Sequence, residues 1–170
     1  IIALLAILIV GIIKKYMITY VIIIANFAVF VFMLFTIENF ELYGFYGTLT
    51  RDLAFRPIYL SLEYSPQLYT ILTSMFVHGG ILHLIGNMLV FIFIGTAFEE
   101  RVGWKKFLII YLLSGVCGTL AHSLLNTGSS VGLVGASGAL FGIMGAFAYS
   151  YPWDKVMMPI PIGFFMMIRR

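Results

Sequence analysis

The chain has 170 residues, of which 62% are hydrophobic and only 10% are charged, and its mean hydropathy is +1.06. Soluble proteins carry about 25% charged residues, so this chain has too little polar surface to cover itself in water, and a disordered chain would need the opposite composition. The net charge of +3 is too sparse for a nucleic-acid surface. The single cysteine, Cys117, permits no disulfide within the chain and fits no zinc pattern. The composition therefore predicts an integral membrane protein.

Four long apolar runs are expected to cross the bilayer as helices, because a spanning helix needs about 20 mostly apolar residues. The runs are Tyr16–Ile37, Ile81–Phe98, Phe107–Leu125 and Leu133–Tyr151. They predict an all-α fold, a polytopic transmembrane helix bundle that forms a single membrane domain over residues 1–170.

The two ends of the chain indicate a piece of a longer protein, since the sequence starts at Ile1 rather than Met and stops just past an apolar run. Residues 1–13 are apolar but short, so they are either the end of a truncated span or an interfacial segment. The stretch Val156–Ile168 contains Pro159 and Pro161 and is expected to be a loop that leads towards a further helix.

The basic residues predict the orientation, because cytoplasmic loops are enriched in Lys and Arg. Eight of the ten basic residues fall on one side of the four-span layout: Lys14, Lys15, Arg101, Lys105, Lys106, Lys155, Arg169 and Arg170. We expect that side to be cytoplasmic and the segments 38–67 and 126–132 to face outward. Residues 38–67 mix aromatic, aliphatic and charged residues, which predicts a partly helical, membrane-associated outer loop.

Several polar residues are expected at one depth, just below the outer surface. His83 and Asn87 are spaced i, i+4 near the outer end of the second span and project from one helix face. Such a pair of donors could stabilise an oxyanion, or could simply hydrogen-bond a neighbouring helix and hold the bundle together. His78 precedes this span, and His122 lies near the outer end of the third.

Ser137 lies between glycines, in Gly135-Ala136-Ser137-Gly138, with Gly142 and Gly145 further along the fourth span. Small residues at these intervals let a helix approach its neighbour closely, so Ser137 could be no more than a small residue on a packing face. The same absence of side chains would also expose a nucleophile. The spacing alone leaves both interpretations open.

Taken together, these motifs closely resemble the rhomboid intramembrane serine proteases, with order and spacing preserved from about Tyr69 to Pro152. The resemblance rests on the following elements in chain order: His78, His83-x-x-x-Asn87, Glu99-x-Arg101 with Gly103, Tyr111-Leu112-x-Ser114-Gly115 and Gly135-x-Ser137-Gly138.

The resemblance implies a rhomboid-like fold and an intramembrane serine endopeptidase that needs no cofactor. It implies Ser137 as nucleophile, His83 and Asn87 with the Ser137 amide as oxyanion hole, and His78 as an accessory histidine near the cavity mouth. Glu99 and Arg101 would be a structural pair at the inner end of the second span. The partners would be transmembrane protein substrates and membrane lipid, with no nucleic acid. We expect a multi-pass protein of the cell membrane with its active site towards the outer face.

The catalytic base is expected outside this chain, because rhomboids place that histidine on their sixth helix. His122 lies at a suitable depth but in the third span, where the family does not place its base. Two positions depart from the common pattern: Tyr69-Thr70 stands where many members carry Trp-Arg, and Phe141 stands where a Tyr is common.

Three other functions are compatible with parts of the sequence. A non-proteolytic rhomboid relative would bind membrane-protein clients without cleaving them. A membrane electron carrier would use two of His78, His83 and His122 as axial haem ligands, although three histidines at one end of the bundle suit that poorly. A channel or transporter fragment would leave the combination of His83, Asn87 and Ser137 unexplained.

Overall fold

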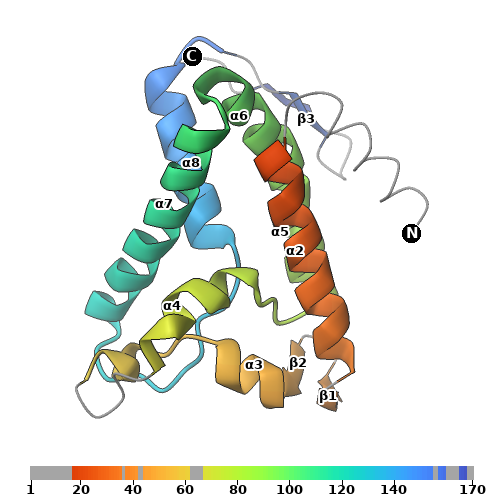
Figure 1. Cartoon of the computed structure of the whole chain (residues 1–170), viewed down its shortest axis with the longest axis vertical. Helices are drawn as coiled ribbons and strands as arrows, with labels where there is room; N and C mark the ends of the chain where they lie inside the picture. Colours follow the sequence, from red (N-terminus) through yellow and green to blue (C-terminus); the bar gives the residue numbers. More distant parts are fainter. Residues whose placement is uncertain are drawn as a thin grey trace.

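The computed structural model describes residues 17–35, 37–41, 44–61, 67–154, 157–159 and 165–167, and side chains within 17–35, 50–61 and 67–154. Helices dominate, and the prediction of an all-α membrane bundle is confirmed. In Figure 1, α7 and α8 form one arm, α2 and α5 form the other, and α3 and α4 lie across one end. The elements are α2 (Met17–Leu34), β1 (Ile37–Glu41), β2 (Gly44–Gly47), α3 (Thr48–Leu53), η1 (Pro57–Leu60), α4 (Thr70–Thr73), η3 (Ser74–Phe76), α5 (Ile81–Val90), η4 (Phe91–Gly95), α6 (Thr96–Val102), α7 (Trp104–Leu125), α8 (Ser137–Ser150), β3 (Met157–Pro159) and β4 (Phe165–Met167).

Three helical segments within the described residues are long and apolar enough to cross a membrane: Met17–Leu34, Ile81–Val102 and Trp104–Leu125. The second is one continuous helix, in which α5 passes into α6 through the π-helical turn η4. The fourth predicted span is shorter than expected, since α8 has only 14 residues and begins at Ser137 rather than at Leu133. Residues 133–136 are not helical because Leu133 pairs with Phe55 and Gly135 has a φ of +108°.

The segment predicted as a partly helical outer loop contains strands as well as helix. The strands β1 and β2 pair antiparallel, with Phe40 opposite Phe45, and are followed by α3 and the short helix η1. No strand was expected in this segment. Near the other end of the chain, β3 and β4 also pair antiparallel, with Met158 opposite Met166. The apolar segment 1–13 and most of the basic residues used for the orientation lie outside the described residues, so the orientation stays a prediction.

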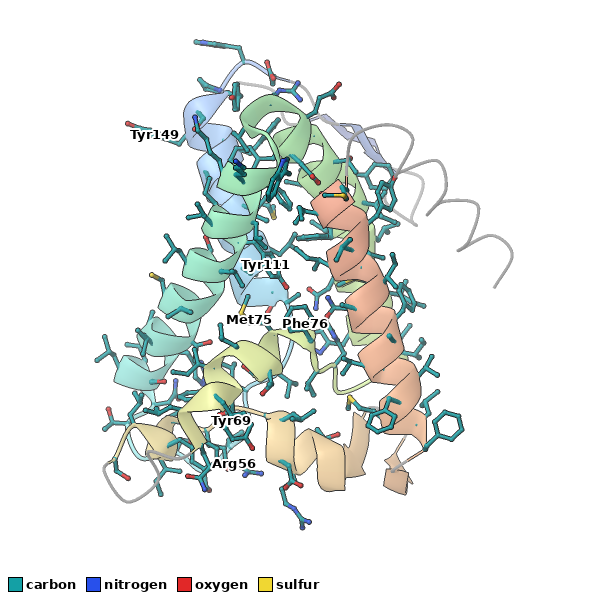
Figure 2. The ribbon with its side chains drawn as sticks, in the orientation of Figure 1. Arg56, Tyr69, Met75, Phe76, Tyr111 and Tyr149 are labelled. Atoms are coloured by element: carbon teal, nitrogen blue, oxygen red, sulfur yellow. The ribbon has the colours of Figure 1, made fainter. Side chains whose placement is uncertain are left out.

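Aromatic side chains fill the core where the second span meets α7 and α8. The Phe91 ring lies 6.0 Å from Phe107 and 5.6 Å from Tyr111, and the Phe98 ring lies 5.9 Å from Phe147. Figure 2 shows Met75, Phe76 and Tyr111 between the two arms of the bundle. Lipid tails are as apolar as these side chains, so close packing rather than exclusion of water holds such a core together.

Glycines bring α7 and α8 into backbone contact. A Cβ added to Gly118 would lie 3.3 Å from the Cα of Gly138, and one added to Gly142 would lie 2.1 Å from the Cβ of Ser114. The interpretation of the α8 glycines as a packing face is therefore confirmed for Gly138 and Gly142. Gly145 has no heavy atom within 4 Å of its added Cβ among those described.

Glu99 holds the first turn of α2 against α6, the C-terminal part of the second span. Its buried carboxylate accepts hydrogen bonds from the backbone amides of Ile18 (3.0 Å) and Thr19 (2.8 Å) and from the Thr19 hydroxyl (2.6 Å). Backbone amides in the first turn of a helix have no partner within that helix. One turn earlier, a Cβ added to Gly95 would lie 3.1 Å from Thr19 Cγ2, so a glycine there allows the close approach.

Arg101 has a separate set of partners, so the two residues expected as a structural pair act on different helices. Its guanidinium donates to the Asp154 carboxylate and to the Ala97 carbonyl (2.7 Å). The same group lies 5.3 Å from the ring centroid of Phe147 and 5.7 Å from that of Tyr151. Arg101 thereby fastens the end of α6 to the end of α8.

Replacing Glu99 with Gln should destabilise the fold by about 2–3 kcal/mol, because the amide that replaces one oxygen leaves buried donors without an acceptor. Glu100→Gln is the matched control, since Glu100 is exposed and adjacent. Thermal and denaturant unfolding of both variants in detergent micelles measures the difference. Equal stability of Glu99→Gln and the wild type would contradict this role.

Candidate active site

The loop before Ser137 is attached by backbone hydrogen bonds to residues 50–61, which belong to the predicted outer loop and are called the outer segment. Phe55 and Leu133 exchange two of them, with N···O distances of 3.1 and 2.6 Å, and the amide of Ile58 donates to the Ser129 carbonyl at 3.1 Å. A Cβ added to Gly132 would lie 3.2 Å from the Cβ of Ala54. The outer segment therefore fixes the path of the chain into α8.

Gly135 brings this loop against the second span. Its φ of +108° is one that side-chain-bearing residues rarely adopt, and its amide donates to the Ser74 carbonyl at 2.9 Å. An added Cβ would lie 2.7 Å from both Cε1 and Nε2 of His83, and 3.6 Å from Nδ2 of Asn87. The two residues predicted to act together are thus both next to a backbone position two residues before Ser137.

His83 and Asn87 differ in their surroundings although they share one face of α5. Asn87 is buried, with 9% of its surface exposed, whereas His83 is exposed in the described part of the chain. The Asn87 Nδ2 is a buried donor without a hydrogen-bond partner among the described residues. Buried donors are rarely left unpaired, so this amide is available to an oxygen that enters the site.

His78 is fully buried rather than at the mouth of a cavity. Its Nε2 accepts the amide hydrogen of Ala136 at 3.5 Å, and its ring centroid lies 5.0 Å from that of His83, at an interplanar angle of 67°. Burial, and next the charge of a protonated His83, lower the pKa of His78 to about 4, while a backbone contact with Phe76 acts in the opposite direction. The ring is therefore neutral near pH 7, as an acceptor nitrogen requires. The close contact of the two imidazoles leaves no space for a porphyrin between them.

Ser137 is the first residue of α8 and lines a cavity of about 180 Å³. The cavity lies between the C-terminal half of α7 and the beginning of α8, and its polar lining includes Ser74, Thr119, His122 and Ser137. Thr119 and His122 share a face of α7 with Gly115 and Gly118, at helical spacing. His122 and Ser137 were expected at one depth, whereas Ser74 and Thr119 were not expected beside them, although the i, i+3 spacing of Thr119 and His122 indicates a shared face.

The structure brings Ser137, His78, His83 and Asn87 to one turn of the chain, residues 135–137. His83 and Asn87 contact that turn at Gly135 and His78 contacts it at Ala136, while Ser137 faces the cavity that His122 also lines. Among the side chains described in residues 50–61 and 67–154, none forms a hydrogen bond with the Ser137 hydroxyl. In the same residues, no three metal-ligating side chains gather in a group that could hold a metal ion.

The family model described as "Rhomboid domain" matches residues 65–169. The chain belongs to the rhomboid family. Curated relatives agree with this over the same half of the chain. "RHOMBOID-like protein 1" of Arabidopsis thaliana is 42% identical over 81 residues, which are 47% of this chain and 20% of that protein. "Rhomboid-like protease 3" of Toxoplasma gondii is 41% identical over 92 residues, 53% of this chain and 34% of that protein.

A bacterial relative, "Rhomboid protease GluP" of Bacillus subtilis, is 38% identical over 95 residues, 56% of this chain and 18% of that protein. The matched part of this rhomboid thus spans between 18% and 34% of the length of these relatives. Two of the three are named as proteases, so the family includes intramembrane proteases as well as members named only for their likeness.

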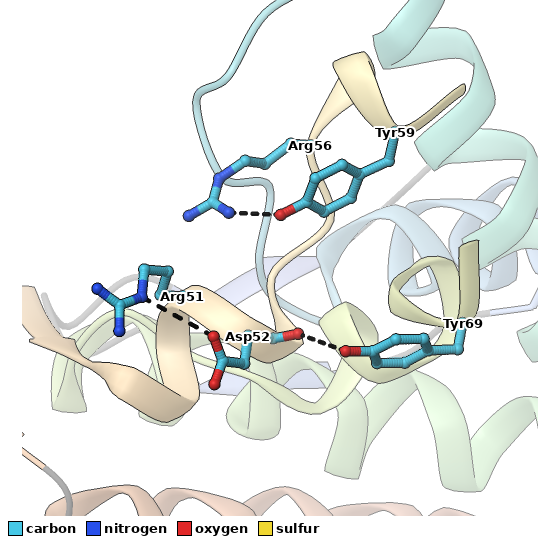
Figure 3. Close-up of polar contacts among 5 residues, drawn as sticks. All are labelled: Arg51, Asp52, Arg56, Tyr59 and Tyr69. Atoms are coloured by element: carbon cyan, nitrogen blue, oxygen red, sulfur yellow. Dashed lines mark hydrogen bonds and ion pairs between the residues drawn. The ribbon is translucent and has the colours of Figure 1, made fainter. Parts of the chain in front are cut away.

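Tyr69 and Thr73 anchor the outer segment of this rhomboid through hydrogen bonds to its backbone. The Tyr69 hydroxyl donates to the Asp52 carbonyl at 3.0 Å (Figure 3), and the Thr73 hydroxyl donates to the Leu53 carbonyl at 2.9 Å. Arg56 braces the same segment by donating to the Tyr59 hydroxyl at 2.5 Å. Beside Ser137, Phe141 is 71% exposed and offers an aromatic face without a hydroxyl.

Gly135→Ala and Gly128→Ala form a matched pair, since both glycines have a positive φ but only Gly135 has neighbours within 4 Å of an added Cβ. Gly128→Ala should cost about 1–2 kcal/mol of stability from backbone strain alone. Gly135→Ala should cost about 2–5 kcal/mol, because a clash with His83 adds to the strain. Thermal unfolding compares them, and an equal loss in the two variants would show that His83 does not lie against residue 135.

Proposed function

We propose that the complete protein is an intramembrane serine endopeptidase and that Ser137 is its nucleophile. The general base would be a histidine that follows residue 170, and the oxyanion hole would consist of the His83 ring, the Asn87 carboxamide and the Ser137 amide. The observation that carries the proposal is the close approach of Gly135 to His83 and Asn87, which brings two side-chain donors to the turn that bears Ser137.

The chemistry follows from these groups. The Ser137 hydroxyl attacks the scissile carbonyl carbon as the base accepts its proton, because a serine hydroxyl is a weak nucleophile without one. Charge develops on the carbonyl oxygen, and the donors of the oxyanion hole stabilise it. The base then gives the proton to the leaving amine, and water hydrolyses the acyl-enzyme to regenerate Ser137.

Two local features support these roles. The Asn87 Nδ2 is buried without a partner among the described residues, so its desolvation already favours binding an anionic oxygen. Ser137 is the first residue of a 14-residue helix, and the positive end of a helix dipole stabilises negative charge at that position.

The substrates proposed for this protein are transmembrane segments that unwind near the outer surface of the cell membrane. Exposed apolar side chains on α2 and α7, such as Phe32 and Leu113, fit contact with lipid along these helices. The active site would then face outward and receive water from that side. No cofactor enters the proposed reaction.

Ser137→Ala should abolish cleavage of a reconstituted transmembrane substrate, whereas Asn87→Ala should lower kcat by about 10²–10³-fold, the usual cost of losing one oxyanion donor. Ser150→Ala, at the exposed far end of α8, is the control and should cleave at the wild-type rate. Near-full cleavage by Ser137→Ala would refute the assignment. A wild-type protein that binds membrane-protein clients but cleaves none would favour the non-proteolytic alternative.

His122 requires its own test, because it lines the same cavity as Ser137. If the base follows residue 170, His122→Gln should keep kcat within a few-fold of wild type and leave the acid limb of the pH–rate profile in place. A loss as large as that of Ser137→Ala in a folded protein would instead identify His122 as the base, since members of a nucleophile–base unit cost about as much singly as together.

A further inference from the structure

We infer that His78 is a positioning residue, which holds the Gly135–Ala136 peptide, directly before the peptide that bears the Ser137 amide, and the orientation of the His83 ring. The inference rests on the proposed function, because it concerns the oxyanion hole of that reaction. It assigns to His78 a role in the rate of the chemical step rather than in substrate entry.

The first contact is with the backbone of Ala136. The His78 Nε2 accepts the Ala136 amide hydrogen at 3.5 Å, and the Ala136 carbonyl accepts the amide hydrogen of Leu140 at 2.9 Å. Both polar backbone groups of Ala136 are therefore held, one by His78 and one by the first turn of α8. The Ala136 carbonyl shares its peptide plane with the Ser137 amide, so the bond to Leu140 sets the direction of that amide and the bond to His78 holds the peptide that precedes it.

The second contact is with His83. The two rings meet nearly edge to face, with centroids 5.0 Å apart, and the backbone of Gly135 is a second neighbour of the His83 ring. Contacts with both His78 and Gly135 restrict the rotation of this ring. His78 therefore touches both parts of the proposed oxyanion hole, the turn that carries the Ser137 amide and the imidazole donor.

The burial of His78 suits a positioning role better than a chemical one. Its side chain has no exposed surface, and it does not line the cavity next to Ser137. A hydrogen bond of 3.5 Å is also long, so its loss should act mainly by letting the peptide turn. Misplacement of about 1 Å in a catalytic constellation can cost 10²-fold in rate.

The test compares His78→Leu with His78→Gln in the full-length protein, reconstituted with a transmembrane substrate. Leu fills the space but accepts no hydrogen bond, whereas the Gln carbonyl oxygen can accept one from Ala136. His78→Leu should lower kcat by about 10–100-fold with KM within about twofold of wild type. His78→Gln should recover most of that loss.

A peptide aldehyde gives a second readout, because its adduct with Ser137 places an oxyanion in the hole and resembles the transition state. Its inhibition constant should rise in His78→Leu by the same factor as kcat falls. Ser123→Ala is the control for the loss of a buried side-chain hydrogen bond, since its hydroxyl donates only within α7, to Thr119 at 2.8 Å. It should leave both quantities unchanged.

Several results would overturn the inference. They are an unchanged kcat in a folded His78→Leu protein, an equal loss in His78→Leu and His78→Gln, or a loss expressed in KM alone. If His78→Leu does not fold, His78→Met serves in its place, with matching thermal unfolding as the criterion. A folded wild-type protein that cleaves nothing would refute the proposed function itself, and the inference with it.

Discussion

The site depends on the backbone of one glycine lying against an imidazole ring. Gly135 adopts a φ of +108°, and its Cα is close enough to His83 that any side chain would overlap the ring. This conformation ends the extended loop, lets α8 begin two residues later and keeps Ser137 beside the second span. If residue 135 were helical, α8 would extend back towards Leu133 and Ser137 would lie within the helix instead of at its first position.

The remainder of the bundle keeps that contact rigid. In a membrane, helices associate through close packing and hydrogen bonds rather than by excluding water. Both kinds of interaction occur in this bundle. Gly118 and Gly138 bring α7 and α8 together, while Gly95 and Glu99 hold the first turn of α2 against the second span. Outside the bundle, the pairing of Phe55 with Leu133 makes the outer segment part of the support for the turn that leads to Ser137.

The sequence predicted the helices, which follow from hydrophobic periodicity, and the site residues that belong to short motifs. Apolar runs gave the helices, and the motifs of Ser137, His83 and Asn87 gave the residues that meet at one turn.

Features that depend on tertiary contact could not be predicted from the sequence. The late start of α8 depends on pairing with Phe55, which is distant in sequence. Arg101 and Glu99 were expected as a pair, but their partners, Asp154 and Thr19, are far along the chain. The strands β1 and β2 were missed because their aromatic residues equally suit a membrane-surface helix.

The most direct test of the account is covalent labelling of the full-length protein with a fluorophosphonate, followed by mass spectrometry of its peptides. The reagent reacts with a serine that a base has activated and whose adduct an oxyanion hole stabilises. We predict a single adduct on Ser137, formed more slowly in the Asn87→Ala protein. An adduct on another serine, or a folded protein that takes up no label, would contradict the claim that the turn at Gly135 forms an active site.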